Sequence, residues 1–490
     1  MKMLSILICF IGTCFSSCSL LELEPTTSWT AENTPKEESH LYGILYGGYN
    51  TLQSDLSINF LAYGEMRGDA FNVNADKVVN NSLDNNIFWA SWYNYYRVIK
   101  QANAVIKFTP QVLEAGGISA EKADDVMGQA YCLRAFTYFW IIRIWGDAPL
   151  VTAPYLDSND SFDLPKAAVA DIVEQIHSDL ENASNMIDKN STSRTTFTQT
   201  AAYAINAHVY AWEHKYEETI NMADKVLTNT NYTLANLYDE KYTGTTDDVK
   251  NKNFKALVQA SEYAQIFNTG RSKESIFELA SNVADGDDQK NLTTYLAGSW
   301  PILRPRPRFG KAIDAEGSTW RSAAIQEVAG SKYKVTKFTI GFDYTADSRN
   351  IVMLRLADII LLKAEAIANQ EDTDENRKAT MKLVNQIRKR AGGSDYEIPE
   401  EQFLNREEYD QEGIKEIVLN ERKYELAYEG HRWFDLIRTG KVFEAVKNRG
   451  NDIGEDESPV IELSPKALVW PIHLEELRRS KLIEQNEYYK

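Results

Sequence analysis

Apolar residues recur at three- and four-residue spacing along most of the chain, which is the period of an amphipathic α-helix. This pattern predicts helices over residues 37–53, 87–108, 120–145, 167–186, 198–227, 353–369, 375–391 and 413–437. The Gly-Asp-Ala-Pro sequence at 146–149 is a stop signal after the third of them. In the first, Gly43, Gly47 and Gly48 predict the close approach of a neighbouring helix. We therefore predict an all-α, mostly helical fold.

The stretch 198–227 has the spacing of two short antiparallel helices. The aromatic, small and branched residues that define it are Tyr203, Ala207, Tyr210, Tyr216, Thr219, Ala223 and Val226. Small residues that let two helices approach, with aromatic rings filling the gap, are typical of a tetratricopeptide repeat. One degenerate repeat can arise by coincidence, but residues 353–391 form a second helix pair of similar size. We predict tetratricopeptide-like helix pairs that stack into a scaffold.

Residues 231–345 break this pattern. They hold clusters of Gly, Asn, Asp and Thr, a proline-rich run at 300–307 and short strand-like pieces such as 334–340. We interpret this stretch as an irregular, loop-rich insert carried on the helical scaffold. Because loops held by rigid helices often carry binding residues, the insert is predicted to supply ligand-binding loops.

The first residues have the composition of an export signal. Lys2 supplies a positive charge, residues 4–11 are apolar but too short to span a bilayer, and small residues precede Cys18. This order resembles a bacterial lipobox, in which the cysteine is diacylated and becomes the new N-terminus. The alternative is ordinary secretory cleavage, with Cys18 a plain thiol. We predict a lipoprotein signal peptide over 1–17 and an acylated N-terminus and tether over 18–34.

Composition narrows the function classes. Hydrophobic residues make up 43% of the 490 residues, which is enough for a sizeable core. The 53 Lys and Arg against 71 Asp and Glu give a net charge of −18, which disfavours a nucleic-acid partner. Once the signal peptide is removed and Cys18 is acylated, Cys132 alone remains free, so no internal disulfide is expected.

Several sequence motifs occur in order along the chain. They are YGEMRGD at 63–69, WYNYYRVIKQAN at 92–103, LRAFTYF at 133–139, WGDAPL at 145–150, LRLAD at 354–358, NQIRKRAG at 385–392 and VWPI at 469–472. Together with CSLLELEP at 18–25 and the charged segment 421–441, this ordered set resembles the SusD/RagB family of outer-membrane nutrient-binding lipoproteins. Each motif alone is weak evidence, whereas their order over nearly the whole mature chain is specific.

The resemblance implies a helical fold with tetratricopeptide-like units, divided into a SusD-like N-terminal region over 35–230, the insert over 231–345 and a C-terminal SusD/RagB region over 346–490. It implies a protein without catalytic activity or cofactor that captures oligosaccharides, or in some members peptides. The implied partner is a SusC-like TonB-dependent transporter, and the implied location is the outer membrane, lipid-anchored and facing the cell exterior. The insert departs from the family pattern, so the identity of the ligand stays open.

The segment 421–441, ERKYELAYEGHRWFDLIRTGK, crowds carboxylates, arginines, a histidine and a tryptophan together. As one helix it would place its Glu and Arg side chains within an arc of about 100°, although Gly430 could interrupt that helix. A glycosidase needs a carboxyl group with a raised pKa, whereas neighbouring cations lower carboxylate pKa values. We therefore interpret the segment as Arg–carboxylate pairs that join helices, with Trp433 buried beside them. His431, a lone histidine, makes no zinc site.

Common catalytic motifs are missing from the sequence, which contains no H-E-x-x-H, G-x-S-x-G, Walker or G-x-G-x-x-G pattern. The acidic cluster at 285–288 lacks the alternation of a calcium-binding loop and is interpreted as a solvated loop. We predict a binding protein rather than an enzyme. An all-α envelope glycosidase and a tetratricopeptide-type scaffold that binds only protein stay open as alternatives.

Aromatic side chains are the candidate ligand-binding groups, because sugar rings stack on them while hydroxyls bind polar groups at the rim. One predicted set consists of Phe71, Asn72, Trp89 and Trp92, and a second of Tyr295, Trp300 and Trp320 in the insert. The resemblance places the loop after Asp69, and Trp92, near the ligand surface of the family. The alternative for Trp89 and Trp92 is core packing.

Overall fold

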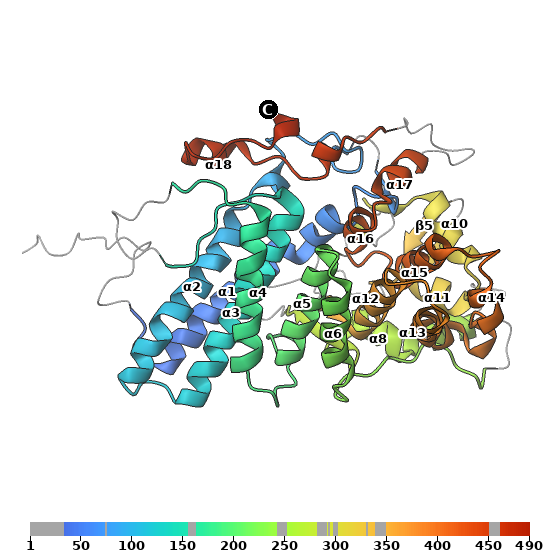
Figure 1. Ribbon diagram of the computed structural model, residues 1–490, viewed down its shortest axis with the longest axis horizontal. Helices are drawn as coiled ribbons and strands as arrows, with labels where there is room; N and C mark the ends of the chain where they lie inside the picture. The colour runs from blue at the N-terminus through green and yellow to red at the C-terminus, as the bar shows by residue number, and fades with distance from the viewer. Residues whose placement is uncertain are drawn as a thin grey trace, which may run out of the picture. The chain divides into compact units, whose positions relative to one another are not determined.

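Long helices form the N-terminal part of the protein. In the computed structural model they are α1 (Glu38–Gly64), α2 (Tyr93–Glu114), α3 (Ala120–Trp145) and α4 (Val169–Met186). Each contacts the next, and Figure 1 shows them side by side. The structure describes residues 34–73, 76–154, 163–242, 252–281, 292, 295–296, 302–329, 332–338, 349–449 and 461–490. These lie, apart from Thr34, in the unit formed by Pro35–Pro154 and Phe162–Lys490.

Local signals explain where these helices begin and end. The Ser119 hydroxyl accepts a hydrogen bond from the Lys122 N–H at the start of α3, and Gly146, with φ of 74°, ends it. The predicted bounds 120–145 are confirmed. The first helix extends well beyond the predicted end at residue 53, and α2 begins later than predicted because residues 88–90 form a 3-10 turn, η1 (Phe88–Ala90).

Two of the three glycines singled out in α1 lie against a neighbouring helix. A Cβ at Gly48 would be 2.8 Å from Leu133 Cδ2, and one at Gly47 would be 3.0 Å from Gln101 Nε2. Nothing lies within 4 Å of the corresponding position at Gly43, so the prediction of close approach is wrong there.

The predicted helix pairs are confirmed. Residues 198–227 form α5 (Gln199–Trp212) and α6 (Tyr216–Leu227), and residues 351–392 form the short strand β6 (Ile351–Arg355), α12 (Leu356–Ala368) and α13 (Asp374–Gly392). The pairs stack through α6 and α12. Buried Ala207 and Ala211 meet Leu362 of α12, with Met222 packed against them, so small side chains let these helices approach.

The insert holds more regular structure than the sequence pattern indicates. It contains α7 (Lys252–Ala260), α8 (Glu262–Asn268), α10 (Pro307–Ala315), α11 (Thr319–Ile325), β2 (Ser275–Leu279), β3 (Arg304–Pro305), β4 (Gln326–Ala329) and β5 (Lys332–Val335). Strands β4 and β5 pair with each other, β2 pairs with β6, and β3 pairs with β1 (Phe71–Asn72), all antiparallel. Strands of the insert are therefore hydrogen-bonded to one scaffold strand that precedes the insert in the sequence, β1, and to one that follows it, β6.

The C-terminal part corrects one prediction. Its helices are α14 (Glu400–Leu404), α15 (Gln411–Glu425), α16 (Arg432–Arg438), α17 (Val442–Asn448) and α18 (Leu474–Arg479), with 3-10 turns η3 (Ser394–Tyr396), η4 (Pro465–Ala467) and η5 (Glu487–Tyr489). The single helix predicted over 413–437 is wrong, because Tyr428 and Gly430 adopt positive φ values of 68° and 82°. This turn lies so close to the end of α1 that a Cβ at Gly64 would be 1.8 Å from the Gly430 carbonyl oxygen.

Buried ion pairs join the helices, as the packing interpretation of segment 421–441 predicts. Arg422 pairs with Asp358 of α12 at 2.8 Å and with Asp435 of α16 at 2.9 Å. Arg355 pairs at 2.7 Å with each of Glu274, Glu425 and Glu429. Trp433 is buried. The guanidinium of Arg67 lies over the Trp433 ring, with its central carbon 4.4 Å from the ring centre. Within the described ranges, no helix combines the length and apolar character needed to cross a membrane.

Candidate functional site

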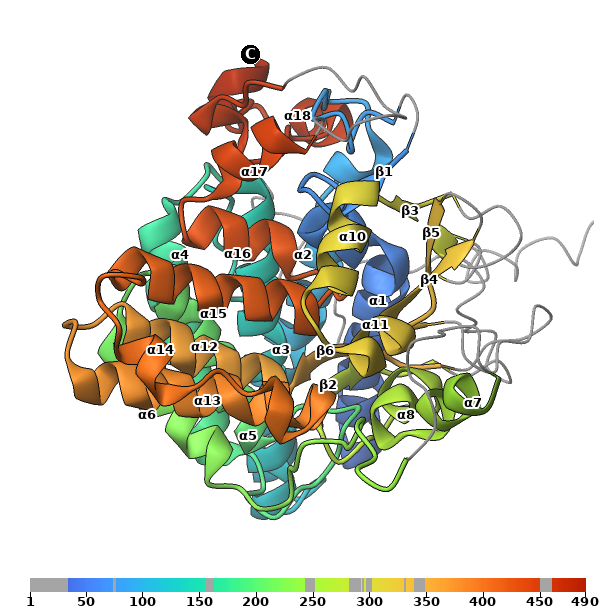
Figure 2. The same cartoon turned by 90° about the vertical axis from the view of Figure 1, so that its right-hand side faces the viewer.

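The short β1–β3 ladder brings the loop after Asp69 next to the insert. Phe71 pairs with Pro305, and the Arg306 N–H donates to the Ala70 carbonyl oxygen at 2.9 Å. Helix α10 starts immediately after β3, with a proline at its first position. Figure 2 shows α10 next to β3, with α15 and α16 facing it.

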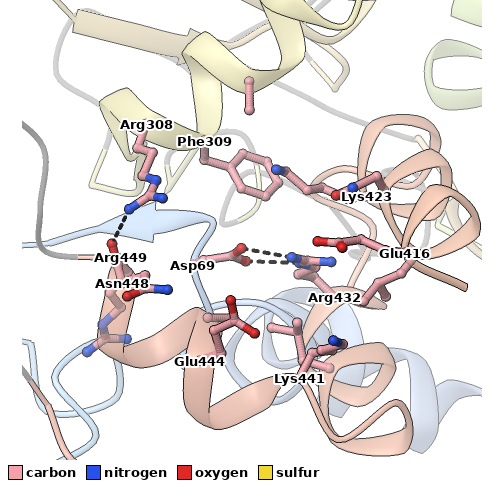
Figure 3. Close-up of a pocket in the computed structure, with 15 residues that line it drawn as sticks. Asp69, Arg308, Phe309, Glu416, Lys423, Arg432, Lys441, Glu444, Asn448 and Arg449 are labelled. Atoms are coloured by element: carbon pink, nitrogen blue, oxygen red, sulfur yellow. Dashed lines mark hydrogen bonds and ion pairs between the residues drawn. The ribbon is translucent and has the colours of Figure 1, made fainter. Parts of the chain in front are cut away.

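A cavity of about 190 Å³ lies where these elements meet. Its walls come from α10, α15, α16, α17 and Asp69, two residues before β1, and Figure 3 shows their side chains converging on it. The charged residues among them are Asp69, Arg308, Glu416, Lys423, Arg432, Lys441, Glu444 and Arg449. Phe309, Leu419 and Leu436 supply apolar surface. The cavity therefore offers many hydrogen-bonding groups and an aromatic ring.

Asp69 and Arg432 form a two-bond pair in the cavity. Arg432 Nε and Nη2 donate to the two carboxylate oxygens of Asp69 at 3.0 and 2.9 Å. Burial opposes the charge on Asp69, but the attraction of Arg432 outweighs it, so the pKa of Asp69 lies below its ordinary value. Both charges are retained at neutral pH, and each holds the other in position.

Two other cations deepen the positive character of the cavity. Burial lowers the pKa of Lys423 to about 8, with Arg432 and Arg308 adding to the shift and Asp69 opposing it. Burial likewise lowers the pKa of Arg449 to about 9. Arg449 donates to the neutral carbonyl oxygens of Arg67 and Gly68, both at 3.0 Å, which leaves its charge without a carboxylate partner among the described residues. The arrangement suits binding through charge and hydrogen bonds.

The first predicted ligand-binding set is divided between core and surface. Phe71 is fully buried against the ring of Tyr428, with centroids 5.2 Å apart, and Trp92 is buried against Trp145, with centroids 6.0 Å apart. Both rings therefore lie in the core, as the core-packing alternative predicts for Trp92. Asn72, in β1, and Trp89, in η1, are half-buried and keep some exposed surface. Contact of this set with a ligand stays a prediction.

The second predicted set is not brought together as one platform. Trp320 is buried, with its ring 4.8 Å from Phe254 and 5.7 Å from Tyr238 between centroids. Tyr295 is half-buried next to β3, where its carbonyl oxygen accepts from the Leu303 N–H at 2.9 Å. Trp300, like the acidic cluster at 285–288, lies outside the described residues. A ligand-binding role for these aromatics stays a prediction.

Sequence reasoning missed Arg308, Lys423 and Arg449 as site residues. Asp69 stands in the YGEMRGD motif, and the family resemblance places the loop after it near the ligand surface, whereas Arg432 stands in segment 421–441, which is interpreted as packing. Their positions, more than 360 residues apart in the chain, converge only through tertiary structure. The signal that could have identified Asp69 and Arg432 is their opposite charge, because one motif contributes an acidic residue and the other a basic one.

Comparisons with known proteins match both halves of the chain. A model described as the SusD family matches residues 313–489, and one described as starch-binding and associating with the outer membrane matches residues 38–211. A SusD-like protein of Formosa agariphila is 26% identical over 527 residues, covering 98% of this chain and 97% of that one. A SusD-like protein of Bacteroides ovatus is 24% identical over 73% of this chain.

Solved structures share the fold. A SusD superfamily protein from Bacteroides vulgatus aligns with a TM-score of 0.74 at 20% identity, covering 93% of this chain and all of that one (100%). A laminarin-binding SusD-like protein aligns with a TM-score of 0.69 at 20% identity, with the same coverage. At these identities the likeness establishes the helical fold.

Proposed function

The chain belongs to the SusD/RagB family, and from that membership we propose that it is a cell-surface lipoprotein that captures glycans and delivers them to a SusC-like TonB-dependent transporter. The cavity at the β1–β3 junction carries this proposal, because it combines polar groups with the aromatic ring of Phe309. The glycan class is supported by the starch-binding description of one family model and by the laminarin-binding neighbour.

The carboxylate that is paired inside the cavity supports capture without bond breaking, whereas burial raises the pKa of Glu65, which lies beside Asp69 and Arg432 but does not line the cavity. A glycosidase needs one carboxyl group that stays protonated near neutral pH. In the turn and helices near the cavity, cationic partners outweigh burial and lower the pKa values of Glu429 and Asp435, the latter to about 2. Asp69, which lines the cavity, is likewise lowered and paired with Arg432. Carboxylates with lowered pKa values are poor proton donors.

Membrane attachment is proposed to run through Cys18, diacylated after removal of residues 1–17. Acyl chains would hold the folded body at the outer membrane, facing the exterior, where a transporter barrel is in reach. The family description that mentions the outer membrane supports this placement.

A peptide ligand is the second candidate. Both Glu416 and Glu444 lie at the exposed edge of the cavity, together with Arg308 and Lys441, so its edge has groups for both termini of a peptide. The charged lining of both signs is the observation that favours it.

Calorimetry across neutral oligosaccharides, acidic oligosaccharides and short peptides tests the proposal. Ala312→Trp fills the cavity without removing a hydrogen bond and is expected to abolish binding. Ala315→Trp, on the exposed side of the same helix α10, is the matched control and is expected to bind normally. Equal binding by both variants would remove the cavity from the proposal, and release of reducing sugar from a polysaccharide would refute capture without catalysis.

The transporter is tested separately. Pull-down from detergent-solubilised outer membrane is expected to recover a large TonB-dependent barrel. Recovery of a soluble protein in its place would favour the assembly-scaffold alternative.

A further inference from the structure

Positively and negatively charged side chains lie at different depths in the cavity. Arg432 and Arg449 are buried, with exposed fractions of 8% and 4%, and Lys423 is half-buried. The carboxylates Glu416 and Glu444 are exposed to water. Because water and salt screen exposed charges much more than buried ones, the deep groups dominate the local potential. At depth, three cations face the single carboxylate of Asp69, which Arg432 already engages.

The deep cations also have hydrogen-bonding capacity to spare. Arg432 Nη1 is buried and makes no hydrogen bond within the part of the chain that the structure describes. Lys423 has no hydrogen bond or ion pair to a described residue, and its ammonium lies 5.5 Å from the ring centre of Phe309. A buried donor of a charged group left without a partner is costly, so such donors mark a place for an acceptor.

We infer that this cavity is a subsite for the anionic group of an acidic sugar, either a uronate carboxylate or a sulfate ester. The inference rests on the proposed function and names the class of glycan. Both groups present planar or tripodal oxygens that guanidinium and ammonium donors bind through charge-assisted hydrogen bonds. Phe309, whose side chain is buried with an exposed fraction of 3%, contributes apolar atoms to the wall beside these donors.

The size of the cavity agrees with one charged sugar unit rather than a chain. A protein cavity of about 150 Å³ can hold one benzene ring, so 190 Å³ suits a single sugar ring. The remaining units of an oligosaccharide would lie outside the cavity. Specificity for an acidic unit would then come from the cavity, and general affinity for glycan from its surroundings.

Calorimetry with four probes tests this inference: an oligogalacturonate, a sulfated galactan oligosaccharide, a neutral gluco-oligosaccharide and an oligoglutamate peptide. At least one acidic oligosaccharide is expected to bind about tenfold or more tightly than the neutral one, with affinity that falls as salt is added. The uronate and sulfate arms tell the two anionic groups apart.

Substitutions at the cavity give the decisive comparison. Lys423→Gln is expected to weaken acidic binding about tenfold and neutral binding less than twofold, while Lys415→Gln, on α15 outside the cavity, changes neither. Lys441→Gln, with Lys447→Gln as its control on α17, repeats the test at the cavity edge should Lys423→Gln fold poorly.

Three outcomes overturn the inference. Equal binding of neutral and acidic oligosaccharides, unchanged in Lys423→Gln, would remove the anionic subsite and leave the proposed function intact. Tighter binding of oligoglutamate than of any sugar would assign the cavity to peptides. Binding of none of the probes would refute the proposed function as well.

Discussion

Replacing Arg355 by methionine tests the idea that the charged segment serves packing. Arg355 is buried, with an exposed fraction of 1%, at the end of β6. Its Nε and Nη2 donate to Glu429 at 2.7 Å, and its Nη1 donates at 2.7 Å to both Glu274 and Glu425. A further bond of 2.9 Å runs from Nη2 to the Glu425 carbonyl oxygen. One side chain thus connects three carboxylates from different elements.

The expected loss in the free energy of unfolding depends on the groups that lose their partner in Arg355→Met. Methionine fills most of the volume of the arginine side chain, so little stability is lost to an empty cavity. The substitution does remove the positive charge that faces the three carboxylates. Each carboxylate keeps another cation: Arg390 for Glu274 and Glu425, and Lys337 for Glu429. Removing one partner of a buried pair typically costs about 3–5 kcal/mol, and the remaining cations place Arg355→Met within that range.

The pH dependence distinguishes this mechanism from a loss of packing. In the folded protein, burial raises the pKa values of Glu425 and Glu429, but attraction to Arg390, Arg355 and other cations outweighs it and holds both values below the ordinary range. These groups stabilise the fold above the unfolded pKa of about 4.3, and that stability is lost as the pH falls below it. Without Arg355 the depression is smaller, so the variant loses less on acidification.

Urea unfolding followed by tryptophan fluorescence measures the difference. The free energies of unfolding of wild type and Arg355→Met are expected to differ most at about pH 7 and to converge as the pH falls from about 4 to about 2, toward the depressed pKa values of Glu425 and Glu429. Arg406→Met is the control, since the pair of Arg406 with Asp374 is exposed and contributes less than about 1 kcal/mol. A loss below about 1 kcal/mol for Arg355→Met, or the same loss at about pH 7 and about pH 2, would refute the reasoning.

Four other predictions follow from single observations. Trp433→Ala, at a buried ring, is expected to lower the free energy of unfolding by about 3–5 kcal/mol, measured by urea titration. Gly64→Ala places a Cβ 1.8 Å from a backbone oxygen and is expected to lower the melting temperature sharply, whereas Gly43→Ala, with nothing within 4 Å, is expected to raise stability by about 0.5–1 kcal/mol. Cys18→Ser is expected to move the protein from the detergent phase to the aqueous phase on Triton X-114 partition. Affinity for an acidic oligosaccharide is expected to rise as the pH falls from about 9 to about 7, because Lys423, with a pKa of about 8, becomes protonated; the profile is expected to flatten in Lys423→Gln.

Periodicity predicted the long helices well, because each buries one continuous face over many turns. The bounds of α3 and the pairing of α5 with α6 needed no information beyond the local pattern. The short helices of the insert, such as α11 with 7 residues, span too few turns for a periodic signal. Gly430 indicated a possible interruption of the helix over 413–437, but the start of the break after Glu425 was not predictable, because a left-handed residue such as Tyr428 has no marker in the sequence.

The candidate site was less predictable for a physical reason. Its polar residues each look like ordinary surface or packing charges in their local context. Asp69 meets Arg432 only after α1, the 426–431 turn and α16 have packed together, and Arg308 joins them through the β1–β3 ladder. Aromatic residues gave the stronger local signal, but in Phe71, Trp92 and Trp320 that signal came from the core.

The two walls of the cavity are held by forces of different strength. The wall formed by α15 and α16 is tied to α12 through the buried pairs of Arg422 with Asp358 and Asp435, so displacing it would expose charges in the core. The wall formed by α10 is held by a ladder of two residues per strand, by the hydrogen bond of 2.6 Å from Arg308 Nη1 to the Asn448 carbonyl oxygen and by the hydrogen bond of 2.7 Å from Gln326 Nε2 to the Gly310 carbonyl oxygen. Substitutions in α10 itself can therefore reshape that wall without removing a member of the buried network, to which Glu274 and Lys337 of the insert also belong. The interactions that are costly to break and the weaker ones therefore lie on opposite sides of the same cavity.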